Sequence, residues 1–326
     1  MSRRLSSLRR FAAEHPRWVV AAELVLFLVF FGFVGWALRG SFRDAADDLR
    51  NANLVLFALG CVAVAAYYLL FVLGWMRILD DWDIHLSYPA ALRAEMVSTL
   101  AKYIPGGVWA PAARVVAAKR AGVNDGALVT ASIVIEAGAS AVAGVIVFVV
   151  SLAFVKGVDA PLAPLIAFAI VVAVLLHPRV FRPLASKVLK RFGFHELPPL
   201  RGATMLILVV FYSFTWVVGG VGLWFMLRAV GAHPGVLSII FLGGVSAVGA
   251  IVAVLSFFAP SGLGPREASM YGLLLGIVGP GAALGATVLN RVAITLVELL
   301  LLVVGGLLLR SRHHDKDALE PADARS

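Results

Sequence analysis

Residues 102–114 read KYIPGGVWAPAAR, and residues 259–267 read APSGLGPRE. Both runs lie inside long apolar regions, and both join proline and glycine to a following arginine. Proline ends a helix because it lacks a backbone N–H and clashes with the preceding turn, and glycine lets the backbone reverse. The two runs therefore predict two breaks in helices that otherwise consist of hydrophobic sequence.

The composition around these breaks is that of a membrane protein. Hydrophobic residues make up 61% of the 326-residue chain and charged residues 14%, and the mean hydropathy is +0.93. Soluble domains are about one-quarter charged, and a helix needs about 20 apolar residues to cross a bilayer. Such stretches cover residues 18–38, 54–79, 127–155, 160–177, 203–228 and 282–309. We therefore predict an all-α integral membrane protein with about six transmembrane helices.

Two further apolar regions, residues 88–120 and 236–280, do not resemble simple crossings. The first contains the break at 102–114, and the second contains Gly243, Gly244 and Gly249 ahead of the break at 259–267. Irregular backbone at membrane depth is tolerated only where protein or a wet cavity covers it. We predict that each region forms a re-entrant pair of half-helices.

Basic residues are grouped at the ends of the predicted spans. They lie near the N-terminus, at Lys119 and Arg120, in the loop 179–201, and at Arg310 and Arg312. Six crossings and two re-entrant pairs place all four groups in the cytoplasm, as the positive-inside rule requires. We expect a multi-pass protein of the cell (plasma) membrane with both termini cytoplasmic. Because the net charge of +9 resides in these flanks, we expect no nucleic-acid partner.

The same topology relates two parts of the chain as an inverted repeat. Residues 54–155 form a span, a broken pair and a span, and residues 203–309 repeat that order in the opposite orientation. Broken helices that meet near the midplane are the architecture of many secondary transporters. We expect one transmembrane domain over residues 1–310, followed by a disordered polar cytoplasmic tail over residues 311–326.

The first break has the features of an anion site. A helix that begins near Pro111 presents free N–H groups and the positive end of its dipole, and a guanidinium one turn later can hold a phosphate bidentately. The alternative is a cytoplasmic loop whose basic side chains snorkel to the headgroups. The candidate substrate-binding residues here are Lys102, Tyr103, Pro105, Gly106, Gly107, Trp109 and Arg114.

The second break repeats this design, with Pro265 at the start of the following half-helix. Arg266 and Glu267 are the only Asp, Glu, Lys or Arg residues between Arg228 and Arg291. A charge inside a membrane costs about 2.5–3.5 kcal/mol on insertion scales, which favours a functional role. The alternative is a mutual ion pair that only closes the bundle. The candidate binding residues here are Ser261, Gly262, Gly264, Arg266 and Glu267.

Three more charged residues lie within predicted spans. Glu136 is in the middle of one span, and Arg291 and Glu298 are seven residues apart in the last, so these two share a helix face. Glu136 and Arg291 stand at equal offsets in the two repeats, which predicts an ion pair between them. Alternatively, Arg291 binds a headgroup phosphate, while a carboxylate carries a proton or faces an amine. A purely structural pair is the third reading, because buried pairs are costly unless well arranged.

The sequence lacks the motifs of common enzymes and cofactor sites. It contains no G-x-x-x-x-G-K-[ST], H-E-x-x-H, C-x-x-C or G-x-S-x-G run, and its only cysteine is Cys61. We therefore expect a protein that is not an enzyme and that uses no cofactor or metal.

The runs KYIPGGVWAPAARVVAAKRAG, residues 102–122, and APSGLGPREA, residues 259–268, resemble two signature segments of one family. This is the lysylphosphatidylglycerol synthase transmembrane region, a flippase-like family that includes the membrane part of the multiple peptide resistance factor. The resemblance covers residues 50–310 approximately. It implies a domain that moves a lipid, typically an aminoacylated phosphatidylglycerol, between leaflets. Charged residues of the family pattern correspond to Arg114, Glu136, Arg266, Glu267 and Arg291. No aminoacyl-transferase sequence follows residue 310, so the chain resembles the stand-alone members.

Three functions fit these observations. The first is a flippase-like transporter whose arginines bind the headgroup of an anionic or aminoacylated phospholipid, or of a related lipid-linked substrate. The second is a secondary transporter of a small anionic solute, and the third is a membrane scaffold subunit without transport activity. The expected partners are an anionic phospholipid and the membrane itself. The sequence leaves open whether the chain forms a homodimer.

Overall fold

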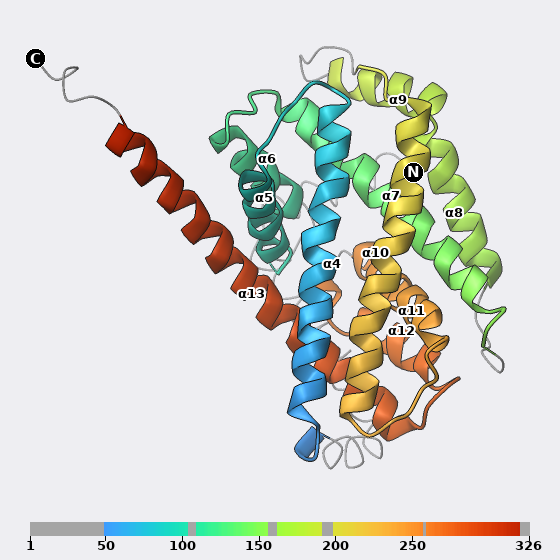
Figure 1. Cartoon of the computed structure of the whole chain (residues 1–326). Coiled ribbons are helices and arrows are strands. Elements are labelled where there is room, and N and C mark those ends of the chain that lie inside the picture. Colours follow the sequence, from blue (N-terminus) through green and yellow to red (C-terminus); the bar gives the residue numbers. More distant parts are fainter. Residues whose placement is uncertain (1–48, 104–108, 156–161, 191–197, 257–258, 320–326) are drawn as a thin grey trace, which may run out of the picture.

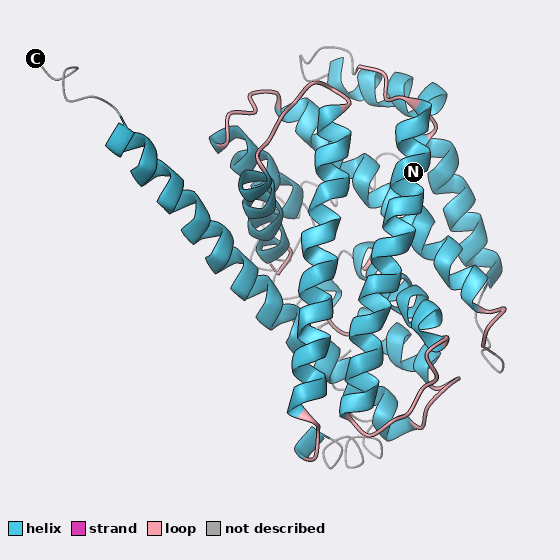
Figure 2. Cartoon of the chain, in the orientation of Figure 1, coloured by secondary structure: helices cyan, strands magenta, loops and turns pink. Residues whose placement is uncertain are grey.

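The computed structural model describes residues 49–103, 109–155, 162–190, 198–256 and 259–319. In these ranges all regular structure is helical, and no strand is present (Figure 2). The helices are α4 (Leu54–Asp80), α5 (Tyr88–Ala101), α6 (Trp109–Arg120), α7 (Gly126–Ser151), α8 (Leu162–Leu176), α9 (Pro178–Lys190), α10 (Gly202–Ala229), α11 (Ser238–Leu255), the short 3₁₀ helix η1 (Pro260–Gly262), α12 (Pro265–Leu274) and α13 (Pro280–Leu319). The all-α class predicted from the sequence is confirmed.

Five of the described helices are long and apolar enough to cross a membrane. They are α4, α7, α10, α11 and the Pro280–Val304 part of α13. Four of them coincide with the spans predicted at 54–79, 127–155, 203–228 and 282–309. The span predicted at 160–177 is α8, which reaches such a length only together with α9, at a bend of 70°. The span predicted at 18–38 lies outside the described residues.

Helix α11 differs from the sequence prediction. It is a continuous 18-residue helix, and Gly243, Gly244 and Gly249 do not interrupt it. These glycines are packing positions: a Cβ atom at Gly243 would lie 2.6 Å from the Trp216 carbonyl oxygen, and one at Gly244 would lie 2.6 Å from the Phe148 Cα. Small residues therefore let α11 approach α10 and α7 closely. At 1.5 Å per residue, α11 is long enough to cross the hydrocarbon layer, whereas the sequence predicts a half-helix in this region.

Helices α4 and α10 form an antiparallel pair at the centre of the bundle (Figure 1). At one end, the Asn53 N–H donates to the Ala229 carbonyl at 2.9 Å. At the other end, Asp81 accepts from the Arg201 N–H at 2.9 Å and from the Thr204 hydroxyl at 3.0 Å. Hydrogen bonds at both ends thus fix the register of the two helices.

The two broken pairs start at opposite ends of this central pair. Helix α5 begins shortly after Asp81, at the end where α10 starts, whereas α11 begins shortly after Ala229, at the other end. In Figure 1, α5 and α6 accordingly lie in the upper half of the bundle, and α11 and α12 lie in the lower half. Helices α5, α6 and α12 have 14, 12 and 10 residues. Each of these three is too short to cross the bilayer alone.

The outer faces of the long helices are apolar. On α10, Leu206, Val210 and Phe214 recur every four residues on one face, and all three are more than half exposed. The interior holds fully buried large side chains, including Trp75, Phe148, Tyr212 and Phe241. An apolar exterior around a packed interior is the arrangement expected of a bundle surrounded by lipid.

The last helix continues beyond the predicted span. Helix α13 runs to Leu319, so the segment predicted to be a disordered tail at 311–326 begins as a helix. Residues 311–319 contain neither proline nor glycine, which explains why the backbone continues without a stop signal.

Candidate functional site

The pair α5 and α6 carries Arg114 into the interior of the bundle. The Ser98 hydroxyl of α5 donates to the Ala110 carbonyl of α6 at 2.9 Å, which ties the two short helices together. Arg114 is only 3% exposed. Its guanidinium forms ion pairs with Glu95 of α5 and with Glu136 of α7. We refer to Glu95, Arg114 and Glu136 as the Arg114 cluster.

Further contacts hold this cluster in place. A second bond joins Arg114 Nη2 to Glu136 Oε1 at 3.3 Å, and the Tyr212 hydroxyl donates to the same oxygen at 3.3 Å. The guanidinium stacks on Trp75 at 4.0 Å from the ring centroid. Glycine at position 74 leaves room for Tyr212, since a Cβ there would lie 2.2 Å from the Tyr212 hydroxyl. Arg114 is therefore committed to internal carboxylates, and it is not free to bind a phosphate as the sequence analysis expected.

A second buried network surrounds Glu298 of α13, which is 1% exposed. Lys102 Nζ and the Tyr68 hydroxyl both donate to Glu298 Oε1. The Tyr103 hydroxyl donates to Glu298 Oε2 at 3.1 Å and lies 3.4 Å from the Thr295 hydroxyl. We refer to Tyr68, Lys102, Tyr103 and Glu298 as the Glu298 cluster. It joins the end of α5 to α4 and α13.

The second break is built from left-handed backbone. Ser261, Gly262 and Gly264 have φ values of 54°, 64° and 95°. Position 262 requires glycine on two counts, because L-residues seldom adopt this φ and a Cβ would lie 2.2 Å from the Ala253 Cβ. Glu267 then caps α12, and its Oε2 accepts from the Gly264 N–H at 2.7 Å. The confirmed start of α12 at Pro265 follows directly from this turn.

Arg291 connects the second break to α13. Its Nη1 lies 3.3 Å from Glu267 Oε1 and donates to the Ser261 carbonyl at 3.4 Å. The prediction that Glu136 pairs with Arg291 is wrong. Glu136 pairs with Arg114 on its own side of the bundle, and Arg291 pairs with Glu267. The equal offsets in the two halves match positions along the helices, but they do not specify which helix faces are in contact.

The two breaks are in direct contact. The Ser261 N–H donates to the Lys102 carbonyl at 2.9 Å, and the Arg291 guanidinium lies 5.5 Å from the centroid of the Tyr103 ring. Six residues predicted from sequence thus share one network: Lys102, Tyr103, Ser261, Glu267, Arg291 and Glu298. Pro105, Gly106 and Gly107 lie outside the described residues. Trp109 begins α6 and is 49% exposed.

A cavity of about 600 Å³, open space at its mouth included, lies between α4, α5, α10, α11, α12 and α13. Arg266 lines it, and in the described part of the chain this guanidinium forms no ion pair. The other lining residues are Val64, Tyr67, Tyr68, Phe71, Glu95, Trp216, Gly219, Ser246, Ala250, Asn290 and Ile294. The cavity therefore combines one unpaired cation with a carboxylate, hydroxyls and an amide.

Several of these polar residues were not predicted from the sequence. Tyr67, Tyr68, Glu95, Ser246 and Asn290 come from four different helices, and only packing brings them together. Glu95 carries one usable signal, because it is the only acidic residue between Asp83 and Asp125. The adjacent Tyr67 and Tyr68 of α4 carry a weaker signal.

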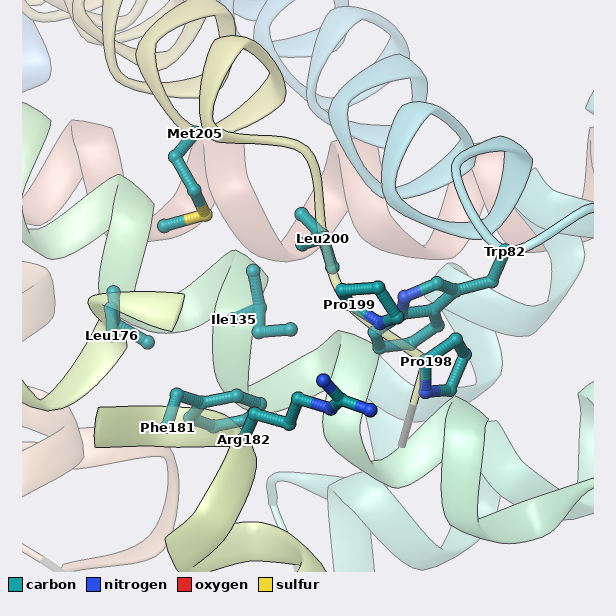
Figure 3. Close-up of a pocket in the computed structure, with 9 residues that line it drawn as sticks. All are labelled: Trp82, Ile135, Leu176, Phe181, Arg182, Pro198, Pro199, Leu200 and Met205. Carbon is teal, nitrogen blue, oxygen red and sulfur yellow. The ribbon is translucent and has the colours of Figure 1, made fainter. Parts of the chain in front are cut away.

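A smaller hollow lies beside α9 (Figure 3). Its lining is apolar apart from Arg182 and the indole of Trp82. Figure 3 shows Ile135, Leu176, Phe181 and Met205 around it, with Pro198, Pro199 and Leu200 closing one side. Its described lining contains no carboxylate or hydroxyl, so this hollow lacks the polar groups that fix a ligand's orientation.

The fold and the site define a class: a multi-span helical membrane protein whose buried charges gather where two broken helix pairs meet. The chain belongs to the family described as the lysylphosphatidylglycerol synthase TM region, whose model matches residues 20–302. The match begins within the predicted first span and extends further towards the N-terminus than the two signature runs indicate. Comparison with curated proteins gives no match.

Proposed function

We propose that this protein is a flippase-like transporter that moves an anionic or aminoacylated phospholipid, or a related lipid-linked substrate, between leaflets, and that it is not an enzyme. The observation that carries the proposal is Arg266, which lines a polar cavity between the two broken helix pairs and forms no ion pair with the described residues. A guanidinium binds a phosphate diester through paired hydrogen bonds, and these are strong where water is scarce. Arg266 is therefore the headgroup-binding cation, whereas Arg114 and Arg291 are held in internal ion pairs.

We propose that the inverted repeat expected from the sequence is the topology behind this transport. The pairs α5–α6 and α11–α12 start at opposite ends of α4 and α10, and their breaks touch through Ser261 and Lys102. We propose that both pairs are re-entrant, although α11 is long enough to span. The basic α9 then lies in the cytoplasm of a plasma-membrane protein, together with both termini. A headgroup held where the breaks meet is reached from either leaflet by small movements of one pair.

Reconstitution tests this function. We would place the purified full chain in phosphatidylcholine vesicles with acyl-labelled phosphatidylglycerol, and follow its movement with dithionite, which reduces only the outer leaflet label. We expect Arg266→Ala to slow translocation by about tenfold or more, because a charge-assisted contact worth at least about 1.4 kcal/mol is lost. Arg266→Lys should retain part of the rate.

The control is Arg228→Ala. Arg228 stacks on Trp224 at 4.9 Å and does not line the cavity, so its loss should leave the rate unchanged. Translocation by Arg266→Ala at the wild-type rate would overturn the proposal. Uptake of inorganic phosphate without lipid movement would instead support the small-solute transporter. Absence of flux of either probe in wild type would leave the scaffold role as the function that fits.

A further inference from the structure

The charges around the two breaks and the cavity of the described bundle are balanced in number but separated in space. They are four cations (Lys102, Arg114, Arg266 and Arg291) and four carboxylates (Glu95, Glu136, Glu267 and Glu298), of which Glu95, Arg114, Glu136 and Glu298 are buried and the others are partly exposed. Lys102 pairs with Glu298, Arg291 pairs with Glu267, and Arg114 is shared by two glutamates. One carboxylate is thus in excess in the Arg114 cluster, and one guanidinium, Arg266, is left without an ion pair.

Both of the excess charges line the same cavity. Glu95 and Arg266 belong to its wall, whereas Glu136 and Arg114 do not. The two glutamates of the Arg114 cluster also differ in how they are held. Glu136 receives two bonds from Arg114 and one from Tyr212, and it is 2% exposed. Glu95 receives only the single contact from Arg114. Glu95 is therefore the carboxylate whose charge can change without breaking the cluster.

An anion in the cavity disturbs this balance. Before an anion binds, Arg266 is the cation on the cavity wall that opposes the charge of Glu95. A phosphate on Arg266 consumes that positive charge, and the Arg114 cluster then carries one uncompensated negative charge in a medium of low dielectric constant. Such a charge is costly, and protonation is the usual way in which a buried carboxylate relieves it.

We propose that Glu95 takes up a proton when an anionic phosphate binds at Arg266, so that the lipid and a proton cross the membrane together. This inference rests on the proposed lipid transport. The proton comes from hydronium in the water of the cavity and forms an O–H bond on the Glu95 carboxyl group. It returns to water on the other side when the phosphate leaves.

The groups that face Glu95 set the sign of this linkage. Arg114 of α6 contacts Glu95 and opposes its protonation, and Arg266 of α12, on the same cavity wall, acts in the same direction. The negative charges of Glu136 of α7 and Glu298 of α13 act in the opposite direction. Tyr67 and Tyr68 of α4 and Tyr212 of α10 are neutral hydroxyls, and Arg291 and Lys102 are already matched by Glu267 and Glu298. Binding of the anion neutralises Arg266, so it raises the proton affinity of Glu95.

The first test measures protons directly. Short-chain phosphatidylglycerol is added to the full chain in a weakly buffered detergent solution that contains a pH indicator, and binding is measured in parallel by titration calorimetry. We expect uptake that approaches about one proton per bound lipid. Glu95→Gln should bind the lipid with no uptake. Asp83→Asn, which removes an exposed carboxylate at a left-handed position that asparagine also tolerates, should behave like wild type. Wild-type binding without proton uptake would overturn the inference.

The second test uses vesicles with a pH difference across the membrane. We expect the gradient to change wild-type translocation of labelled phosphatidylglycerol by about fivefold or more, as for a typical coupling of two ligands. Glu95→Gln should move the lipid at a rate that does not depend on the gradient. Gradient-independent transport by wild type would refute proton coupling and leave lipid transport intact, whereas no lipid movement under either condition would refute the function itself. Both of these results are measured on wild type, so they hold even where Glu95→Gln folds poorly.

Discussion

The Arg114 cluster and the Glu298 cluster use similar residues but hold them differently. Arg114 is 3% exposed, and two carboxylates and an indole face contact its guanidinium, while Tyr212 donates to one of these carboxylates. Around Glu298, the donors Lys102 and Tyr103 lie at the end of α5, next to the first break. The Lys102 side chain is 25% exposed, and the neighbouring Arg291 and Glu267 side chains are 15% and 25% exposed.

This difference in exposure indicates which network is fixed and which one opens. Removing one partner of a buried ion pair strongly destabilises the folded protein. The loss of stability is smaller where water reaches the remaining partner. The Arg114 cluster has no such relief. The network at the breaks does, because the side chains of Lys102, Arg291 and Glu267 are partly exposed. We infer that the breaks separate during transport, while the Arg114 cluster stays intact.

The largest effect that tests this comparison is expected from Arg114→Met. The substitution keeps much of the apolar volume but leaves Glu95 and Glu136 in the interior without their cation. We expect a loss of about 3–5 kcal/mol in the free energy of unfolding, measured by denaturant titration in detergent micelles. Arg266→Met is the matched comparison, because it removes an arginine that forms no ion pair in the described chain and Glu95 can take up a proton in its place. It should therefore cost no more than about 1.4 kcal/mol, well below the loss for Arg114→Met. Equal stability of the two variants would mean that the Arg114 cluster is not a fixed element.

The long spans could be predicted from the sequence because hydropathy over a window is a local property. The predicted spans at 54–79 and 203–228 differ from α4 and α10 by at most one residue at each end. The breaks could also be predicted from local sequence, because proline and glycine determine the conformation of their own backbone. Gly243 was misread for a related reason: a glycine that bends a chain and a glycine that admits a neighbouring helix look alike in sequence, and only the Trp216 carbonyl against α11 distinguishes them.

The site was predicted less completely, because its partners come from separate helices. Arg291 and Glu298 were assigned to one helix face, and the structure places both at the breaks, paired with Glu267 and Lys102. The partner of Arg114 depends on how α6 packs against α5 and α7, which no residue spacing encodes. Glu95 was overlooked as a site residue for this reason, although it joins the Arg114 cluster to the cavity.

A smaller effect is expected from Glu298→Ala at the breaks. Lys102, Tyr68 and Tyr103 lose their acceptor, but the partly exposed Lys102 can turn to water. We expect a loss of about 1.5–3 kcal/mol in the same titration, which is the usual range for hydrogen bonds to a charged group. The breaks should also loosen. In a Cys61→Ala background, a Ser261→Cys reporter should react faster with a water-soluble thiol reagent than it does beside intact Glu298.

The reporter with Asp83→Asn supplies the control for this experiment, because that carboxylate lies on an exposed turn away from the breaks. Its labelling rate should equal that of the reporter alone. If Glu298→Ala destabilised the protein as strongly as Arg114→Met, with no change in labelling, the two clusters would be equivalent and the breaks would not be the part that opens.

The smallest effect separates two tyrosine hydroxyls that each donate to a glutamate. Tyr212 is fully buried and donates to Glu136 at 3.3 Å, whereas Tyr103 is partly exposed and donates to Glu298 at 3.1 Å. Tyr212→Phe should cost about 0.5–1.5 kcal/mol, because the carboxylate oxygen cannot exchange the lost donor for water. Tyr103→Phe should cost less than that, because Lys102 and Tyr68 remain on Glu298 and water replaces the hydroxyl. The distances alone predict the opposite order, so a larger loss for Tyr103→Phe would show that bond length, rather than access to water, determines the strength of these two networks.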